Sequence, residues 1–209
     1  MNKMTRRAFA ATGLALAVAP RPSLAQQPQP IRARGTVEKV DGDTFDAKLR
    51  DGSAAKLKLK DGAVVRGVIP IKLTDIKAGM MVGVTSIPQA DGTLRAYEVH
   101  TFPPQQRVNE GHGKYDTEPN SLMTNGLLET SVADVSGQVL TVKYKQGDKV
   151  EEKKVIITPQ TILVTTVPGD KSEIKPGAKF VVFGALKQPD GSLEVATISI
   201  GRDGLTPPM

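Results

Sequence analysis

An internal repeat is the feature of this sequence that most constrains its fold. Residues 34–102 match residues 129–201 in three blocks, with small insertions between the blocks. The matching blocks are 37–52 with 132–147, 74–79 with 172–177, and 91–94 with 190–193. Because a solenoid needs three or more repeats to bury a continuous core, two copies predict a duplicated domain.

Each copy has the pattern of short antiparallel strands. Phe45, Ala47 and Leu49 alternate with charged residues, and the second copy repeats this alternation from Leu140 to Tyr144. A period of two residues is typical of a strand with one buried face. Asp-Gly pairs, which favour tight turns, occur at 41–42, 51–52, 61–62, 91–92 and 190–191. The predicted fold class is all-β, with two tandem, related OB-like or small β-barrel repeats and a polar connecting loop.

A short element of the form Asp/Glu-Ile-Lys-x-Gly recurs at 75–79 and 173–177. We expect one helical turn or a tight loop at each place. Its isoleucine would fill the barrel and its glycine would turn the chain. The duplication is explained by this architectural role.

The first 25 residues resemble a removable twin-arginine export signal. Arg6 and Arg7 precede an apolar run at 8–19, and small residues precede a cleavage point after Ala25. The run is shorter than the about 20 residues that cross a bilayer. We expect a periplasmic protein, exported by the twin-arginine route or, alternatively, by the general secretory route. Cleavage lowers the formal net charge from +6 to +2, because it removes Lys3, Arg6, Arg7 and Arg21.

The rest of the chain divides into five predicted parts. They are 26–32, a flexible N-terminus; 33–102, the first β repeat; 103–125, a polar linker loop; 126–201, the second β repeat; and 202–209, a flexible or extended tail. No segment after the signal has the length and apolar character of a transmembrane span. The sequence has no cysteine, which excludes disulfides and thiolate metal ligands.

The repeat resembles a known family in its turn motifs, which are Gly35-Thr36-Val37, Val40-Asp41-Gly42, 75–79 and 91–96. The family is a domain of unknown function that forms small OB-like β domains in exported bacterial proteins. The resemblance covers nearly the whole chain after the signal, once per repeat. Because the shared motifs are structural turns, the resemblance implies no catalytic or binding residue.

The chain as a whole is similar to proteins automatically labelled metal ABC transporter permease. The additional similarity lies in 110–112, 121–125 and 201–209. A permease needs several spans of about 20 apolar residues, and the sequence after the signal offers none. A connection with metal transport would therefore be that of a soluble periplasmic accessory.

A metal centre is the sharpest site hypothesis that the sequence supports. Its two histidines, His100 and His112, lie close in sequence to carboxylates, among them Glu110 and Asp116. Imidazole and carboxylate groups bind zinc, copper or nickel, and Met123 would add a thioether for Cu(I). The histidines do not have the spacing that places two rings on one ion.

His112 also has a structural interpretation. Gly111 and Gly113 on either side allow a tight turn, so the ring would bond a carbonyl or carboxylate and tether the linker. Tyr115 would then pack the linker onto a barrel. In this alternative the linker docks one repeat against the other and binds no metal.

Other function classes have little support in the sequence. A nucleic-acid groove needs aromatic platforms and excess positive charge, but the chain after the signal has no tryptophan, seven aromatic residues and nearly balanced charge. Known nucleophile and zinc-hydrolase motifs do not occur. We expect a periplasmic, non-catalytic binding or scaffold protein whose partner is an envelope protein or glycan, and which binds no nucleic acid. The alternative is the metal-handling accessory, and a hydrolase-like enzyme is a minor alternative.

Overall fold

The computed structural model describes residues 29–103, 109–134 and 137–209. The predicted export signal lies outside these residues. The described part is all-β, as the alternation predicts, and contains twelve strands and three short 3-10 turns. The strands are β1 (Ile31–Asp41), β2 (Thr44–Leu49), β3 (Ala54–Pro70), β4 (Met81–Pro88), β5 (Leu94–Thr101), β6 (Gly111–Lys114), β7 (Leu122–Asp134), β8 (Gly137–Gln146), β9 (Lys149–Ile157), β10 (Ile162–Pro168), β11 (Lys179–Lys187) and β12 (Leu193–Gly201).

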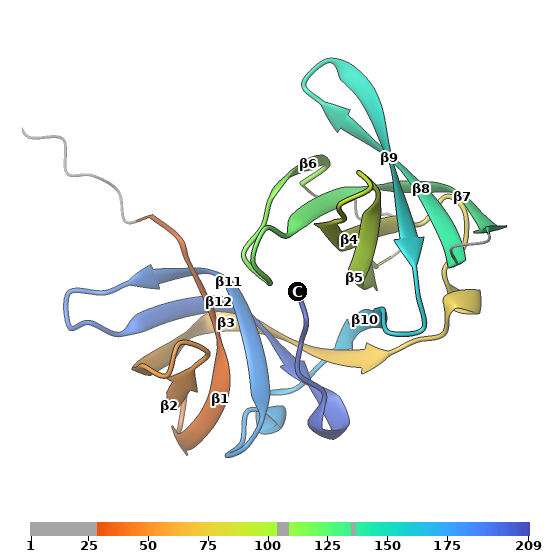
Figure 1. The fold of residues 1–209 in the computed structure, drawn as a ribbon. Helices are drawn as coiled ribbons and strands as arrows, with labels where there is room; N and C mark the ends of the chain where they lie inside the picture. The colour runs from red at the N-terminus through yellow and green to blue at the C-terminus, as the bar shows by residue number, and fades with distance from the viewer. Residues whose placement is uncertain (1–28, 104–108, 135–136) are drawn as a thin grey trace, which may run out of the picture.

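Five strands close a small mixed barrel in the order β12-β11-β1-β2-β3 (Figure 1). Neighbours along this order are antiparallel, and the barrel closes through a parallel pairing of β12 with β3. The barrel combines three strands from the first predicted repeat with two from the second. Its closure therefore depends on segments from both ends of the chain.

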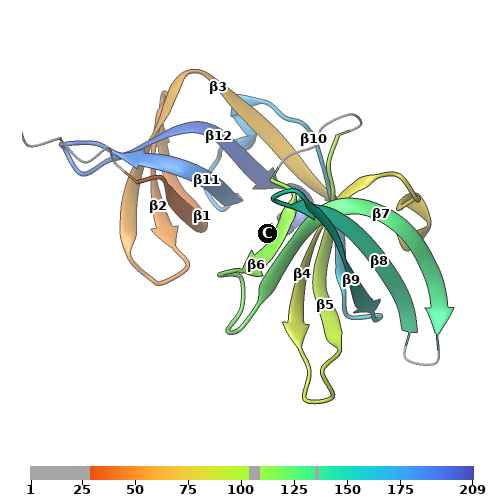
Figure 2. The same cartoon turned by 90° about the horizontal axis from the view of Figure 1, so that it is seen from above.

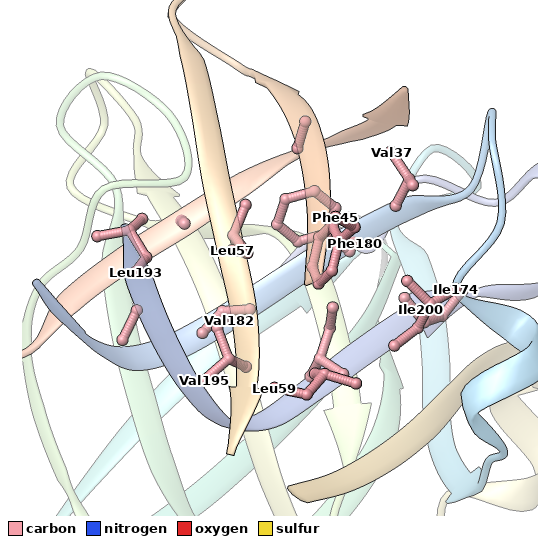
Figure 3. Close-up of a cluster of buried hydrophobic side chains, with 14 of the residues drawn as sticks. Val37, Phe45, Leu57, Leu59, Ile174, Phe180, Val182, Leu193, Val195 and Ile200 are labelled. Atoms are coloured by element: carbon pink, nitrogen blue, oxygen red, sulfur yellow. The ribbon is translucent and has the colours of Figure 1, made fainter. Parts of the chain in front are cut away.

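The inward residues of these strands form the barrel core (Figure 3). Phe45 of β2 meets Phe180 of β11 edge to face, with ring centroids 5.7 Å apart. Both rings are buried, as are Val37, Leu57 and Val195. Full burial of such a side chain contributes about 1.5–3 kcal/mol, so this core supplies much of the stability of the barrel.

The other seven strands extend the sheet beyond the barrel. β3 passes out of the barrel and pairs with β10, after which the order is β10-β5-β4-β7-β8-β9, with β6 added beside β7. One further ladder position, Arg95 with Ile156, joins β5 to β9. A second apolar core lies among these strands and includes Val84, Leu128 and Leu140. The two halves lie side by side in both views (Figure 1, Figure 2).

The repeated isoleucine element forms a tight turn and buries its isoleucine in both copies, but only Ile174 fills the barrel. Each copy includes part of a 3-10 turn, η1 (Leu73–Asp75) or η2 (Lys171–Glu173). Ile76 and Ile174 follow these turns and are buried in the two apolar cores. Gly79 and Gly177 then turn the chain with φ of 83° and 84°, which a residue with a side chain adopts only under strain.

The structure differs from the sequence prediction in three segments: the N-terminal segment, the linker and the C-terminal tail. β1 begins at Ile31, inside the predicted flexible N-terminus, because it pairs with β11. The predicted linker loop at 103–125 contains β6 and the first residues of β7, since its backbone adds to the edge of the β7 ladder. The tail also differs: after the turn η3 (Arg202–Gly204), residues 207–209 are buried between the two halves. None of the helical segments in the described residues has the length and apolarity required to cross a membrane.

Candidate ligand-binding cavity

A cavity of about 370 Å³ lies between the outer face of the barrel and the second half of the molecule. One wall is formed by β1, β2 and β11, and the other by β5, β10, the loop after β6 and the C-terminal tail. The lining residues are Arg34, Gly35, Thr36, Lys48, Leu49, Arg50, Tyr97, Thr117, Ile162, Lys179, Phe180, Thr206, Pro207 and Pro208. This volume falls in the range of about 300–1,000 Å³ typical of small-molecule sites.

Two lysines flank Thr36 on the barrel wall. Thr36 pairs with Lys48 of β2 on one side and with Lys179 of β11 on the other. Directly opposed residues in antiparallel strands point to the same face. Their neighbours Val37 and Phe180 are buried in the barrel core, so Thr36 and the two lysines point outward. Within the described residues, neither lysine forms an ion pair.

Arg34 connects the barrel with the tail and with the linker. Its Nε donates to the main-chain oxygen of Met209 at 2.8 Å, and its Nη2 donates to Oδ1 of Asp116 at 3.0 Å. Oδ1 of Asp116 also accepts from Nη1 of Arg32 at 2.6 Å. Burial raises the pKa of Asp116, but hydrogen bonds from Arg34 and Arg32 outweigh burial and lower this pKa below its usual value. Asp116 therefore acts as the counterion of two arginines.

Arg50 makes a similar connection next to Arg34, whose main-chain oxygen accepts from the backbone N–H of Arg50 at 2.8 Å. Nη1 of Arg50 donates to the main-chain oxygen of Thr117 at 2.6 Å, and its Nη2 donates to Oε1 of Glu118 at 3.1 Å. Burial raises the pKa of Tyr97, and the neighbouring carboxylate of Glu118 raises it further. Tyr97 therefore remains a neutral hydrogen-bonding group at neutral pH.

Thr117 carries a buried hydroxyl that lacks a hydrogen-bond partner. The residue is 2% exposed, and no partner for its Oγ1 exists within the described part of the chain. A buried polar atom without a partner costs about 1–3 kcal/mol.

An aromatic stack holds the linker against the barrel. The guanidinium carbon of Arg32 lies 4.5 Å from the ring centre of Tyr115 and 5.3 Å from that of Phe183. Such contacts are cation–π interactions. Tyr115 thus packs the linker onto the barrel, which is the docking role that the sequence suggested for it.

His100 belongs to a buried chain of polar side chains outside the cavity. Its Nδ1 lies 2.6 Å from Oε1 of Glu98, and Oε2 of Glu98 accepts from Oγ1 of Thr85 at 2.7 Å. Glu98 is fully buried and His100 is 7% exposed. The two hydrogen bonds compensate the carboxylate for its loss of water.

His112 and Glu110 both hold β6 in place. Nδ1 of His112 lies 2.8 Å from Oγ1 of Thr124, so the ring bonds a hydroxyl rather than the expected carbonyl or carboxylate. Oε2 of Glu110 accepts from the backbone N–H of Lys145 at 3.1 Å. Burial lowers the pKa of His112, and the nearby Lys153 lowers it further. These contacts tether β6 to β7 and β8 within the second half, and they do not dock one half against the other.

The four predicted metal-ligating residues are not brought together. His100 is opposite Gly83 of β4, whereas His112 is opposite Thr124, which pairs with Val84. Successive residues of a strand point to opposite faces, so the two rings lie on opposite faces of this sheet. Among residues 29–103, 109–134 and 137–209, no group of three or more histidine, aspartate or glutamate side chains is arranged to hold a metal ion.

Sequence reasoning missed the cavity because its walls come from segments far apart in the chain. Alternation along β2 places Lys48 and Arg50 on one outward face, which is a detectable signal. It does not show that Thr117, Pro207 and Tyr97 cover that face. Thr117 and Pro207 lie in segments that the sequence predicts to be a linker loop and a flexible or extended tail, and Tyr97 comes from a strand of the first predicted repeat.

Comparison with known proteins identified no relative: no family model, no curated protein and no solved structure matches the chain. The resemblance drawn from the turn motifs stays a prediction.

Proposed function

We propose that this chain is a non-catalytic binding protein whose ligand is a small anionic molecule held in the cavity between the barrel and the tail. The observation that carries the proposal is the lining of that cavity. Four residues with basic side chains line it, and Thr117 of the linker and the C-terminal tail cover it.

Charge favours an anion in this position. Arg34, Lys48, Arg50 and Lys179 line the cavity, while the acids bound to its arginines are Asp116 and Glu118. The basic groups therefore outnumber the acidic ones. In a partly enclosed site with low-dielectric walls, such an excess attracts and concentrates anions.

The apolar part of the lining favours a ligand with a carbon skeleton. Ile162, Pro207 and Pro208 contribute apolar surface beside the charged groups. Pockets for small molecules typically combine apolar walls with a few well-placed polar groups. A bare inorganic ion would leave this apolar surface without a contact.

The proposal also includes the predicted periplasmic location and the predicted relation between the two halves. A ligand carrier in the periplasm would agree with the export signal expected at residues 1–25. The strand sequence β5-β4-β7-β8-β9 and the β5–β9 contact support the idea that the second half is a related, less completely closed barrel. An envelope protein or glycan would then receive or donate the ligand.

A metal-handling role is the second candidate, supported by the contact between Glu98 and His100. A histidine that binds metal commonly has its other ring nitrogen bonded to a carboxylate. The contact of Nδ1 with Glu98 fits this arrangement. Titration with Zn²⁺, Cu²⁺ and Ni²⁺ tests it; affinity weaker than about 1 μM, roughly −8 kcal/mol, would reject it.

Calorimetric titration of the purified protein with succinate, butyrate and inorganic phosphate tests the anion proposal. We expect at least one organic anion to bind, and Lys48→Met or Lys179→Met to weaken its binding. Lys187→Met is the matched control because Lys187 is an exposed lysine on the same strand as Lys179, outside the cavity lining. If no anion binds, or if all three variants behave alike, the proposal is wrong.

A further inference from the structure

We infer that the ligand carries two anionic groups at the ends of a short apolar chain, as a linear dicarboxylate does. This inference rests on the proposed anion site and specifies its ligand class. Two observations support it. The two arginines of the cavity already have counterions, and the two lysines, which have none among the described residues, lie apart from each other.

The arginines of the cavity are already neutralised by the protein itself. Arg34 is bonded to Asp116, and Arg50 is bonded to Glu118. These interactions also fix the guanidinium groups to the linker, so that the arginines build the walls. Their charge contributes little to the net charge that a ligand encounters.

The lysines supply the charge that is left uncompensated. Lys48 and Lys179 form no ion pair within the part of the chain that the structure describes. Together they contribute two positive charges to the cavity. A ligand with two negative charges would balance them.

The two lysines also lie apart from each other. β1 runs between their strands, and each lysine is opposite Thr36 of β1. Neighbouring strands are about 4.8 Å apart, so the two lysine backbones are separated by roughly 10 Å. Two ammonium groups repel each other, which favours separate anionic groups over one shared group.

The space between the lysines suits a short hydrocarbon chain. Ile162 and Pro207 provide apolar surface, and the cavity of about 370 Å³ limits the ligand to a small molecule. One dicarboxylate thus engages both lysines and the apolar wall.

Calorimetry with matched probes tests this class directly. Glutarate and butyrate have similar carbon chains but differ by one carboxylate. We expect glutarate to bind at least about 10-fold more tightly, since a hydrogen bond to a charged group contributes about 1.5–3 kcal/mol. Lys48→Met and Lys179→Met should each remove about 10-fold of glutarate affinity and change butyrate affinity by no more than about 2-fold.

Lys187→Met completes the experiment. This variant removes an exposed lysine outside the cavity lining and should not change glutarate affinity. Thermal unfolding of each variant confirms that it is folded.

The possible outcomes separate the inference from the proposed function. Equal affinity for glutarate and butyrate, or tighter binding of inorganic phosphate than of any dicarboxylate from succinate to adipate, overturns the inference and leaves the anion site standing. If none of these anions binds, both the site and the inference are wrong.

Discussion

At the scale of single residues, close contacts around His100 restrict what its neighbours can be. Gly83 of β4 lies against the His100 ring, and a Cβ atom at this position would overlap the ring and approach Oδ1 of Asn125. The ring cannot move away freely, because Glu98 holds its Nδ1. Glycine at position 83 is thus explained by space and not by backbone conformation.

Gly83→Ala should therefore lower the free energy of unfolding. We expect a loss of about 1–3 kcal/mol, the usual cost of adding volume to a well-packed site. Gly113→Ala is the matched control, because a Cβ at Gly113 of β6 would meet no atom within 4 Å. Urea unfolding of both variants measures the difference; equal stabilities would show that the His100 ring adjusts without cost.

At the scale of elements, three hairpin turns are stabilised by the same pair of hydrogen bonds. The carboxylates of Asp51, Asp91 and Asp190 each accept a backbone N–H and a hydroxyl from the residue two positions later. Side-chain and backbone hydrogen bonds lower the pKa of all three carboxyls below the usual 3.8. The ionised form is therefore favoured more in the folded state than in the unfolded state.

This shift predicts a specific dependence of stability on pH. A depressed carboxyl pKa contributes stability that is complete above pH 3.8, the value of the unfolded group, and is lost as pH falls through the lower folded pKa. The triple variant Asp51→Asn, Asp91→Asn, Asp190→Asn keeps an acceptor oxygen but cannot titrate. Its free energy of unfolding should fall less than that of the original protein between about pH 5 and pH 2. Parallel curves for the two proteins would contradict the assignment.

The elements themselves were more predictable than their partners. Alternation and Asp-Gly turns indicate β2 and its hairpins, because those interactions are local in sequence. The pairing of β1 with β11, and the burial of Met209, depend on contacts between distant segments. The polar residues of β6 show no strand pattern in the sequence, because β6 forms by pairing with β7 and not through the properties of its own residues.

The same distinction explains the candidate site. Residue types suggested His100 and His112 as partners, but strand register places their rings on opposite faces. The cavity instead uses lysines and arginines, which are common on solvated strand faces. Only the covering tail and linker distinguish these basic residues from the rest of the surface.

At the scale of the whole molecule, the two halves depend on each other. β3 passes from the barrel to β10, and β10 continues the sheet into β5. Met209 packs with Val68, Val164 and Val181, which come from β3, β10 and β11. This small cluster joins the barrel to the second half at the place where the tail ends (Figure 2).

We therefore expect the protein to unfold in a single transition. Tyrosine fluorescence reports on the second half and on its contact with the barrel, because Tyr97 and Tyr144 lie in the second half, Tyr115 packs against Arg32 of the barrel, and the chain has no tryptophan. Far-ultraviolet circular dichroism reports on the strands of both halves. The two urea curves should coincide; separate midpoints would show that the halves unfold independently.

The barrel is completed by β11 and β12, the last strands of the chain, and this affects folding during synthesis. β1, β2 and β3 leave the ribosome long before β11 and β12, which complete their barrel. Until then the three strands keep unpaired edges, which are prone to association with other chains. The barrel is a late product of biosynthesis, and chaperone protection of the nascent N-terminal strands would have its greatest effect before residue 201 is made.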